Sequence, residues 1–207
     1  YWAQDPLLVV TGAEAPLLAN PYLGARAVTT VYFTTVLKEL RETDDWHLAL
    51  LPDGQEGWIE GQAVQRRPAH CLFPRGTPDD LLATARRFIG TPYLWGGLTP
   101  RGWDCSGFVQ IVYKAHGYVL PRDAGQQLAA PIGSLVERSK LAPADLVFFG
   151  EAGKVTHVAL YHGEGEYIHA TGRERKVVVN SFDSSSPLYR QDLDDMYAGA
   201  RRIAVSP

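Results

Sequence analysis

Short apolar runs separated by turn residues fill the first third of the chain. Five such runs lie between residues 7 and 65, and the pairs Asn20-Pro21, Asp44-Asp45 and Asp53-Gly54 are typical of the turns between strands. The runs are LLVV, ARAVTTVYF, TTVLKEL, WHLALL and GWIEG. Several strands within about sixty residues predict a small β-barrel, in which Trp46 and Trp58 either pack in the core or line a groove.

The apolar period becomes helical after residue 77. Thr77 is placed to cap a helix that Pro78 begins and Gly90 ends, with an apolar stripe at Leu81, Leu82, Ala85, Phe88 and Ile89. A second helix is predicted in CSGFVQIVYKAHG, with Gly117 as its stop. Strand-like runs follow in DLVFF, HVALYH, EYIHA, KVVVN and ARRIAV, with short helices expected at residues 123–128 and 188–193. Helices followed by a meander of strands predict an α+β arrangement.

Residues 68–78 follow neither period. This segment holds three prolines, Gly76 and mixed charge, which is typical of a linker. The pattern therefore predicts a β-barrel domain over residues 1–67, a linker over residues 68–77 and an α+β domain over residues 78–207.

Composition and charge narrow the class of protein. Hydrophobic residues make up 45% of the chain and charged residues 21%, which excludes a disordered chain and a coiled coil. The net charge is −3, so we expect no nucleic-acid partner and no anionic membrane surface as a partner. Every apolar stretch is far shorter than the ~18 residues of a membrane span, so we expect no membrane insertion. We also expect a monomer. No secretory signal is visible, which favours the cytoplasm, although removal of a leader before Tyr1 would favour the envelope or secretion.

Two cysteines are present, Cys71 in the linker and Cys105 at the start of the second helix. They form no C-x-x-C pair, and the chain has no H-E-x-x-H motif, so we expect no metal and no cofactor. Unpaired N–H groups and the helix dipole favour a thiolate at Cys105, and Gly107 would leave room for a substrate beside the sulfur. Cys105 is therefore a candidate nucleophile, with a small buried residue at a helix start as the alternative. The sequence indicates no role for Cys71.

A cysteine nucleophile needs a base and a third group that orients the base. His157 opens the run HVALYH and His169 lies in the next run, so adjacent antiparallel strands can bring the two rings side by side. We rank His157 as the base and His169 as its orienter, while His162 would point to the opposite face of its strand. The remaining histidines lie in the barrel, in the linker and at the far end of the Cys105 helix: His47, His70 and His116. For each histidine taken alone, a structural role is the alternative.

Several motifs beyond residue 78 occur in a fixed order. They are YLWGG from Tyr93, GWDCSGF around Cys105, PRDA around Arg122, DLVFF from Asp145, HV at His157 and IHA around His169. In this order and spacing, residues 78–205 resemble the NlpC/P60 family of papain-like cysteine peptidases, and WHLALLPDGQEGWI resembles the hairpin that closes the bacterial SH3 (SH3b) domain often fused to it. Within the family the likeness is to γ-D-glutamyl-L-diamino-acid endopeptidases, which act on peptidoglycan stem peptides and use the SH3b domain as one wall of the site.

The resemblance implies roles in catalysis for matching residues. Cys105 would be the nucleophile, His157 the base and His169 the group that orients His157. The Tyr93 phenol would reach an oxyanion or the substrate, beside backbone N–H groups of the helix start.

The resemblance also implies residues that bind the substrate. Asp104 and Ser106 would contact it, with Asp104 as the partner of a free L-Ala ammonium. Arg122 and Asp123 would shape the same pocket, or would serve only as an ion pair and a helix cap. Two residues of the barrel are candidates to complete the pocket, Tyr22 and Glu56.

Two positions depart from the family's pattern. Pro143-Ala144-Asp145-Leu146 stands where members often have P-G-D-L, so either alanine adopts a turn conformation with φ > 0 or the turn is remodelled. Ala124 stands where some relatives have a serine, which removes a hydroxyl from the substrate side. Neither departure touches the proposed catalytic residues.

The resemblance implies a murein stem peptide as the partner, cleaved between γ-D-Glu and an L-diamino acid, either diaminopimelate or Lys, through a Cys thioester. The peptide would carry a free N-terminal L-Ala, in cell-wall recycling or turnover. Acyl transfer or hydrolysis of another amide on the same fold is one alternative, because a fold does not determine the acyl acceptor. A non-catalytic module that binds wall peptides is the other.

Overall fold

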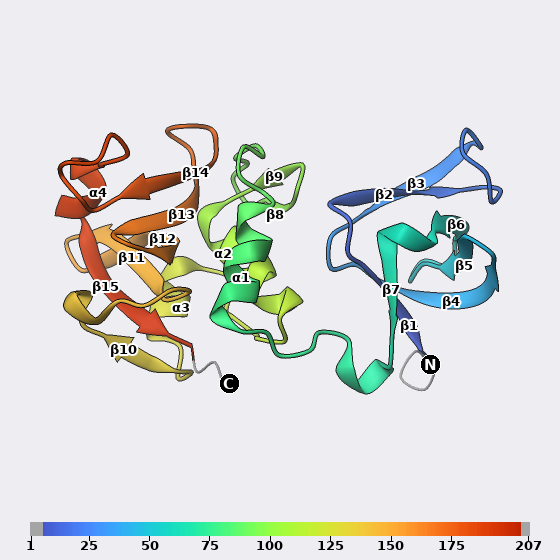
Figure 1. Cartoon of the computed structure of the whole chain (residues 1–207), viewed down its shortest axis with the longest axis horizontal. Coiled ribbons are helices and arrows are strands. Elements are labelled where there is room, and N and C mark those ends of the chain that lie inside the picture. The colour runs from blue at the N-terminus through green and yellow to red at the C-terminus, as the bar shows by residue number, and fades with distance from the viewer. Residues whose placement is uncertain (1–5, 204–207) are drawn as a thin grey trace. The chain divides into compact units, whose positions relative to one another are not determined.

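The computed structural model describes residues 6–203. The chain divides into two compact units, with the boundary between Pro74 and Arg75 (Figure 1). Each unit contains an antiparallel sheet of its own. None of the helices in residues 6–203 is both long enough and apolar enough to cross a membrane.

The N-terminal unit is a seven-stranded antiparallel sheet. In the order β3-β2-β6-β5-β4-β1-β7, its strands are Ala27–Tyr32, Glu14–Leu18, Glu56–Glu60, Trp46–Leu50, Val36–Thr43, Leu7–Val10 and Val64–Arg67. Five of them match the apolar runs of the sequence. The other two, β2 and β7, carry weak strand signals, since β2 contains Pro16 and β7 reads VQRR at an edge of the sheet.

The core of this unit is formed by buried aliphatic side chains from the strands, among them Leu8, Leu17, Leu37 and Ile59. Trp58 packs in the interior beneath the guanidinium of Arg41, whereas Trp46 is only half-buried. No ladder between the outer strands β3 and β7 is seen in the described part of the sheet, so the predicted closed barrel is not confirmed.

The predicted linker is divided between the two units. A short 3-10 helix, η2 (Ala69–Cys71), follows β7, and the Arg67 side chain donates a hydrogen bond to the carbonyl of Leu72. Beyond the boundary, Gly76 donates its backbone N–H to His116, and Tyr118 donates its hydroxyl to the carbonyl of Gly76. The last residues of the predicted linker are therefore part of the C-terminal unit.

Over its described residues, 75–203, the C-terminal unit combines four α-helices with a six-stranded sheet. The helices are α1 (Pro78–Arg86), α2 (Cys105–Ala115), α3 (Ala124–Ala129) and α4 (Gln191–Asp195). In the order β10-β15-β11-β12-β13-β14, the strands are Ser134–Val136, Tyr197–Arg202, Leu146–Glu151, Lys154–Gly163, Glu166–Thr171 and Lys176–Ser181. A separate hairpin joins β8 (Leu98–Thr99) to β9 (Gly102–Trp103), and a last 3-10 turn is η3 (Arg138–Lys140). Helices followed by strands confirm the α+β arrangement.

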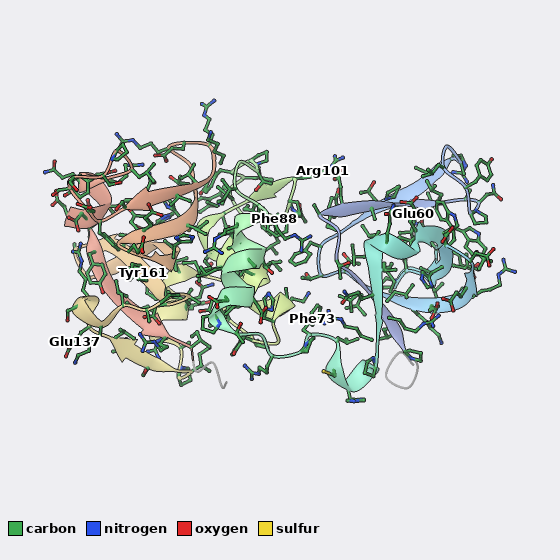
Figure 2. The ribbon with its side chains drawn as sticks, viewed as in Figure 1. Glu60, Phe73, Phe88, Arg101, Glu137 and Tyr161 are labelled. Atoms are coloured by element: carbon green, nitrogen blue, oxygen red, sulfur yellow. The ribbon has the colours of Figure 1, made fainter. Side chains whose placement is uncertain are left out.

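Helix α2 is central to this unit. It packs on α1, β12 and β13 (Figure 1). Its side chains Phe108, Val109 and Val112 are fully buried. Phe88, labelled in Figure 2, lies edge-on to the buried ring of Trp103 at 5.3 Å between centroids. The run Leu146–Phe149 is buried on both faces of β11, with Val147 and Phe149 packed in a cluster with Leu193 of α4, which explains why this strand is apolar without alternation.

Helix α1 begins as predicted but ends early. Thr77 accepts a hydrogen bond from the backbone of Asp80, whose carboxylate accepts one from Thr77 N–H, and Pro78 occupies the first turn. The helix ends at Arg86, so Ile89 lies beyond it and is exposed. Gly90 then has φ of +89° and donates its N–H to Val177 in β14. The helix predicted at residues 188–193 is also shifted, because residues 188 to 190 run beside β14 instead.

The turn before β11 contains an alanine in the left-handed region. Ala144 has φ of +67° and is buried, so alanine adopts the conformation that glycine would take without strain. Its N–H donates to the carbonyl of Tyr161, its own carbonyl accepts from the Tyr113 hydroxyl, and the neighbouring Asp145 side chain accepts from Ala142. These bonds hold the strained turn in place.

Candidate active site

Cys105 is the first residue of α2. Asp104 precedes it as the N-cap, and its carboxylate accepts a 2.6 Å hydrogen bond from the backbone of Gly107. Burial raises the pKa of the Cys105 thiol, although hydrogen bonds from backbone N–H groups, with Val158 foremost, act in the opposite direction. Burial therefore opposes the thiolate that the helix start favours, and a thiolate at Cys105 stays a prediction.

The side chains of His157 and His169 meet on neighbouring strands. His157 Nε2 lies 2.6 Å from His169 Nδ1, and the ring centroids are 4.9 Å apart. If the register that pairs Leu160 with Ile168 is continued along β12, His157 lies diagonally across from His169 on one face of the sheet. The two rings therefore lie side by side, as the order of the strands predicts. His157 does not open its strand, because β12 begins at Lys154.

The His169 side chain is fully buried, and His157 is partly buried. Burial lowers the pKa of His169 from its ordinary value near 6.5 to about 4, even though the hydrogen bond with Asn180 favours the charged ring. Burial also lowers the pKa of His157 well below the ordinary value, with the charges of His169 and Arg190 acting in the same direction. The pair is therefore neutral at neutral pH.

Asn180 is a member of this site that the sequence analysis missed. Its Oδ1 lies 2.8 Å from His169 Nε2, and it stands in β14, the strand beside β13. The only sequence signal is a polar residue at the end of the apolar run Val177–Val179, on a strand predicted next to that of His169.

Tyr93 lies near the sulfur and the helix cap. Burial raises the pKa of Tyr93, and the nearby Cys105 and Asp104 raise it further, so the phenol stays protonated as a hydrogen-bond donor. Its ring packs over Gly172, where an added Cβ would lie 3.4 Å from the ring. The backbone of Tyr93 is bridged to Trp103.

Asp104, Ser106 and Arg122 form one hydrogen-bond network. Arg122 binds both carboxylate oxygens of Asp104 and donates a 2.9 Å hydrogen bond to Ser106 Oγ. The second carboxylate oxygen of Asp104 also accepts from the backbone of Gly96 at 3.0 Å. Protein donors thus already occupy both oxygens of this buried carboxylate. A direct contact of Asp104 or Ser106 with substrate stays a prediction.

Arg122 and Asp123 have the contacts of the structural alternative. Arg122 forms the ion pair with Asp104, and Asp123 is the N-cap of α3 in a capping box with Gln126. Ala124 is the buried first residue of that helix. A role for either residue in shaping a substrate pocket stays a prediction.

Gly107 packs closely against its neighbours in the protein. A Cβ at this position would overlap the carbonyl oxygen of Gly97 and press on the Asp104 carboxylate. The first turn of α2 is packed so closely on the segment before β8 that only glycine fits, so packing within the protein explains this glycine, and open space beside the sulfur stays a prediction.

The other histidines and Cys71 lie elsewhere. His162 accepts a hydrogen bond from Arg86, His116 is paired with Thr84, and His47 is paired with Glu39 in the N-terminal unit. His70 and the exposed Cys71 belong to η2. Tyr22 and Glu56 are also in the N-terminal unit, and their part in a site stays a prediction. Between residues 6 and 203, no three side chains of His, Cys, Asp or Glu gather as ligands for a metal ion.

Comparison with known proteins identifies the family. Residues 90–194 match the model of the NlpC/P60 family. The chain belongs to the NlpC/P60 family. A Bacillus cereus structure from this family has a TM-score of 0.84 to the chain with 34% identity, covering 98% of the chain and 64% of that structure.

Two curated relatives align with nearly the whole chain. A Bacillus cereus gamma-D-glutamyl-L-lysine dipeptidyl-peptidase is 36% identical over 201 residues, which cover 96% of the chain and 58% of the relative. A Lysinibacillus sphaericus dipeptidyl-peptidase 6 is 32% identical over 197 residues, which cover 93% of the chain and 70% of the relative. The chain therefore spans less than two thirds of the first relative.

Proposed function

We propose that the C-terminal unit is a cysteine peptidase that hydrolyses the bond between γ-D-Glu and the L-diamino acid of peptidoglycan stem peptides. The observation that carries this proposal is the hydrogen-bonded pair of His157 and His169 beside a helix that begins with Cys105, in a chain of the NlpC/P60 family. The name of one relative, gamma-D-glutamyl-L-lysine dipeptidyl-peptidase, supports a γ-glutamyl peptide as the substrate, and the name of the other, dipeptidyl-peptidase 6, supports the release of a dipeptide.

The first half of the reaction forms a thioester. His157 takes the proton of the Cys105 thiol as the sulfur attacks the carbonyl carbon of the γ-D-Glu amide. The Tyr93 phenol and the backbone N–H groups of the helix start stabilise the oxyanion. Collapse of the tetrahedral intermediate breaks the carbon–nitrogen bond, and His157 delivers its proton to the departing amine of the diamino acid.

The second half releases the acid. His157 takes a proton from water as the water attacks the thioester carbonyl, and the carbon–sulfur bond breaks. His157 then gives that proton to the departing sulfur, which restores the thiol and the neutral imidazole. Burial raises the pKa of the Cys105 thiol and lowers that of His157, which favours the neutral thiol and the neutral imidazole at the start and end of each cycle.

The N-terminal unit is proposed to be an SH3b domain. The hairpin of β5 and β6, which carries Trp46 and Trp58, and the small all-antiparallel sheet support this assignment. With such a domain we propose that the substrate has a free N-terminal L-Ala. The diamino acid that follows γ-D-Glu in it is either diaminopimelate or Lys.

Product analysis by mass spectrometry tests the proposal. The full chain is incubated with L-Ala-γ-D-Glu-L-Lys and with its diaminopimelate counterpart, beside the α-linked isomer and N-acetylated peptides as controls. We expect L-Ala-γ-D-Glu and the free diamino acid from the unblocked γ-linked peptides, and none of either with Cys105→Ala. Cleavage that is unchanged in Cys105→Ala would rule out the proposed nucleophile.

The same experiment separates the alternatives. With an added amine acceptor, an amide of L-Ala-γ-D-Glu would indicate acyl transfer. Binding of the peptide without product after long incubation would indicate a non-catalytic module.

A further inference from the structure

We propose that Asn180 is a positioning residue, which selects through His169 the tautomer of His157 that accepts the Cys105 proton. The inference deepens the proposed function, on which it rests. It starts from an unbroken row of side chains across three strands, from β12 through β13 to β14.

The orientation of the Asn180 amide is determined by the backbone. Its Nδ2 donates to the carbonyl oxygen of Leu188 at 3.4 Å, and a carbonyl can only accept. The same carbonyl accepts a 2.9 Å hydrogen bond from the backbone N–H of Ser181, and Arg190 N–H donates back to the Ser181 carbonyl. Residues 188 to 190 are thus held along β14, and Oδ1 of Asn180 is directed at His169.

The Asn180 amide then determines both tautomers. Oδ1 can only accept, so His169 Nε2 carries the hydrogen in the 2.8 Å bond. Neutral His169 has its lone pair on Nδ1, so His157 Nε2 must be the donor in the 2.6 Å bond. Neutral His157 therefore has a bare Nδ1, which is the nitrogen that is free to take a proton from the thiol.

The charged groups around the two rings largely compensate one another. Arg190 is the cation near both rings, and it binds Glu174 and Asp192, whose carboxylates also act on His169. The phenol of Tyr167 in β13 lies with its ring 5.3 Å from that of His169. The Asn180 amide is a neutral acceptor, so it orients His169 without adding a negative charge that would favour protonation of the ring.

A carboxylate at position 180 provides the test. Asn180→Asp keeps the acceptor oxygen and adds a negative charge, which favours the protonated form of the histidine pair. The Cys105 thiol should therefore lose its proton at a lower pH. In a Cys71→Ser background, we expect the alkylation rate of Cys105 by iodoacetamide at pH 6 to rise about tenfold, which corresponds to ~1 pH unit in the profile. Asn20→Asp, at the only other asparagine and an exposed position, is the matched control and should leave the profile unchanged.

The tautomers of the unmodified protein provide a second readout, which needs no substrate. Nitrogen-15 NMR at pH 7 should show both rings protonated at Nε2 and bare at Nδ1. In Asn180→Leu, which lacks the acceptor, we expect the Nδ1-protonated form of His157 to become populated. A wild-type His157 that is protonated at Nδ1, or an Asn180→Asp profile identical to that of the wild type, would overturn the inference. Loss of peptide cleavage alone would count only against the proposed substrate.

Discussion

The guanidinium of Arg122 binds both carboxylate oxygens of Asp104, the residue that caps the helix of Cys105. Arg122 comes just before α3, so this ion pair joins the starts of two helices. It also holds the carboxylate where Gly96 and Gly107 donate to it. The position of the nucleophile thus depends on a side chain that lies 17 residues further along the chain.

Removal of Arg122 should therefore weaken the C-terminal unit. Arg122→Met leaves a buried carboxylate without its cation, and we expect the free energy of unfolding to fall by about 1–3 kcal/mol, as for lost hydrogen bonds to charged groups. Urea titration followed by tryptophan fluorescence measures the change. Arg173→Met removes an exposed arginine from its pair with Asp192 and should cost about 0–1 kcal/mol. Equal losses in the two variants would show that the ion pair of Arg122 with Asp104 stabilises the fold no more than an exposed ion pair does.

Replacement of Ala144 by glycine should stabilise the protein. At φ of +67° alanine carries a strain of about 1–2 kcal/mol that glycine lacks. The greater conformational entropy of glycine in the unfolded chain offsets part of this gain. We expect a net gain of ~0.5–1 kcal/mol by urea titration. Ala130→Gly is the control, because Ala130 is also buried but has φ of −60°, and it should lose stability. A loss in Ala144→Gly would mean that this turn holds no such strain.

Acid should destabilise the fold through His169. The folded pKa, lowered to about 4 by burial, is below the unfolded value near 6.5, so protons bind the unfolded state first as the pH falls. Above pH 6.5 this ring causes no loss of stability. As the pH falls toward 4, the free energy of unfolding decreases by about 3 kcal/mol. Denaturant titrations at several pH values measure the slope.

His169→Gln, which cannot titrate, should show a shallower decline of stability over that range. His162→Gln changes a histidine outside the hydrogen-bonded row and should keep the wild-type slope. Parallel pH curves for His169→Gln and the wild type would contradict the assignment of the acid sensitivity to His169.

Replacement of His157 should abolish most of the proposed peptidase activity. Without the base, kcat should fall by about 10²–10⁴-fold. This loss should not depend on any change in the thermal midpoint of the protein. Steady-state cleavage of the γ-linked tripeptide measures kcat, and His162→Ala serves as the matched variant on the same strand. If His162→Ala lost as much activity as His157→Ala, the choice of base would be wrong.

The parts of the site that were predictable are those with a local cause. Thr77 and Pro78 begin α1 through a capping box that is written in adjacent residues, and the alternation of β12 and β13 brings His157 to His169. Asn180 could not be predicted, because its role depends on a β13–β14 pairing and on the carbonyl of Leu188. The crowding at Gly107 was missed for the same reason, since Gly97 lies ten residues away in sequence.

Strands β2 and β7 were missed because neither has a strong pattern of its own. Pro16 in β2 pairs with Thr30, and β7 pairs only with β1. Their strand conformation comes from pairing with neighbouring strands rather than from local propensity, both for β2 inside the sheet and for β7 at its edge.

The carbonyl of Leu188 ends the row of hydrogen bonds that starts at His157. Every residue type has a backbone carbonyl, so no substitution at position 188 can delete this acceptor. An insertion or deletion among residues 182–187 could, because it would shift the chain beside β14. Drift in the length of that loop, rather than in its residue types, is therefore the evolutionary change to which the orientation of the histidines is most vulnerable.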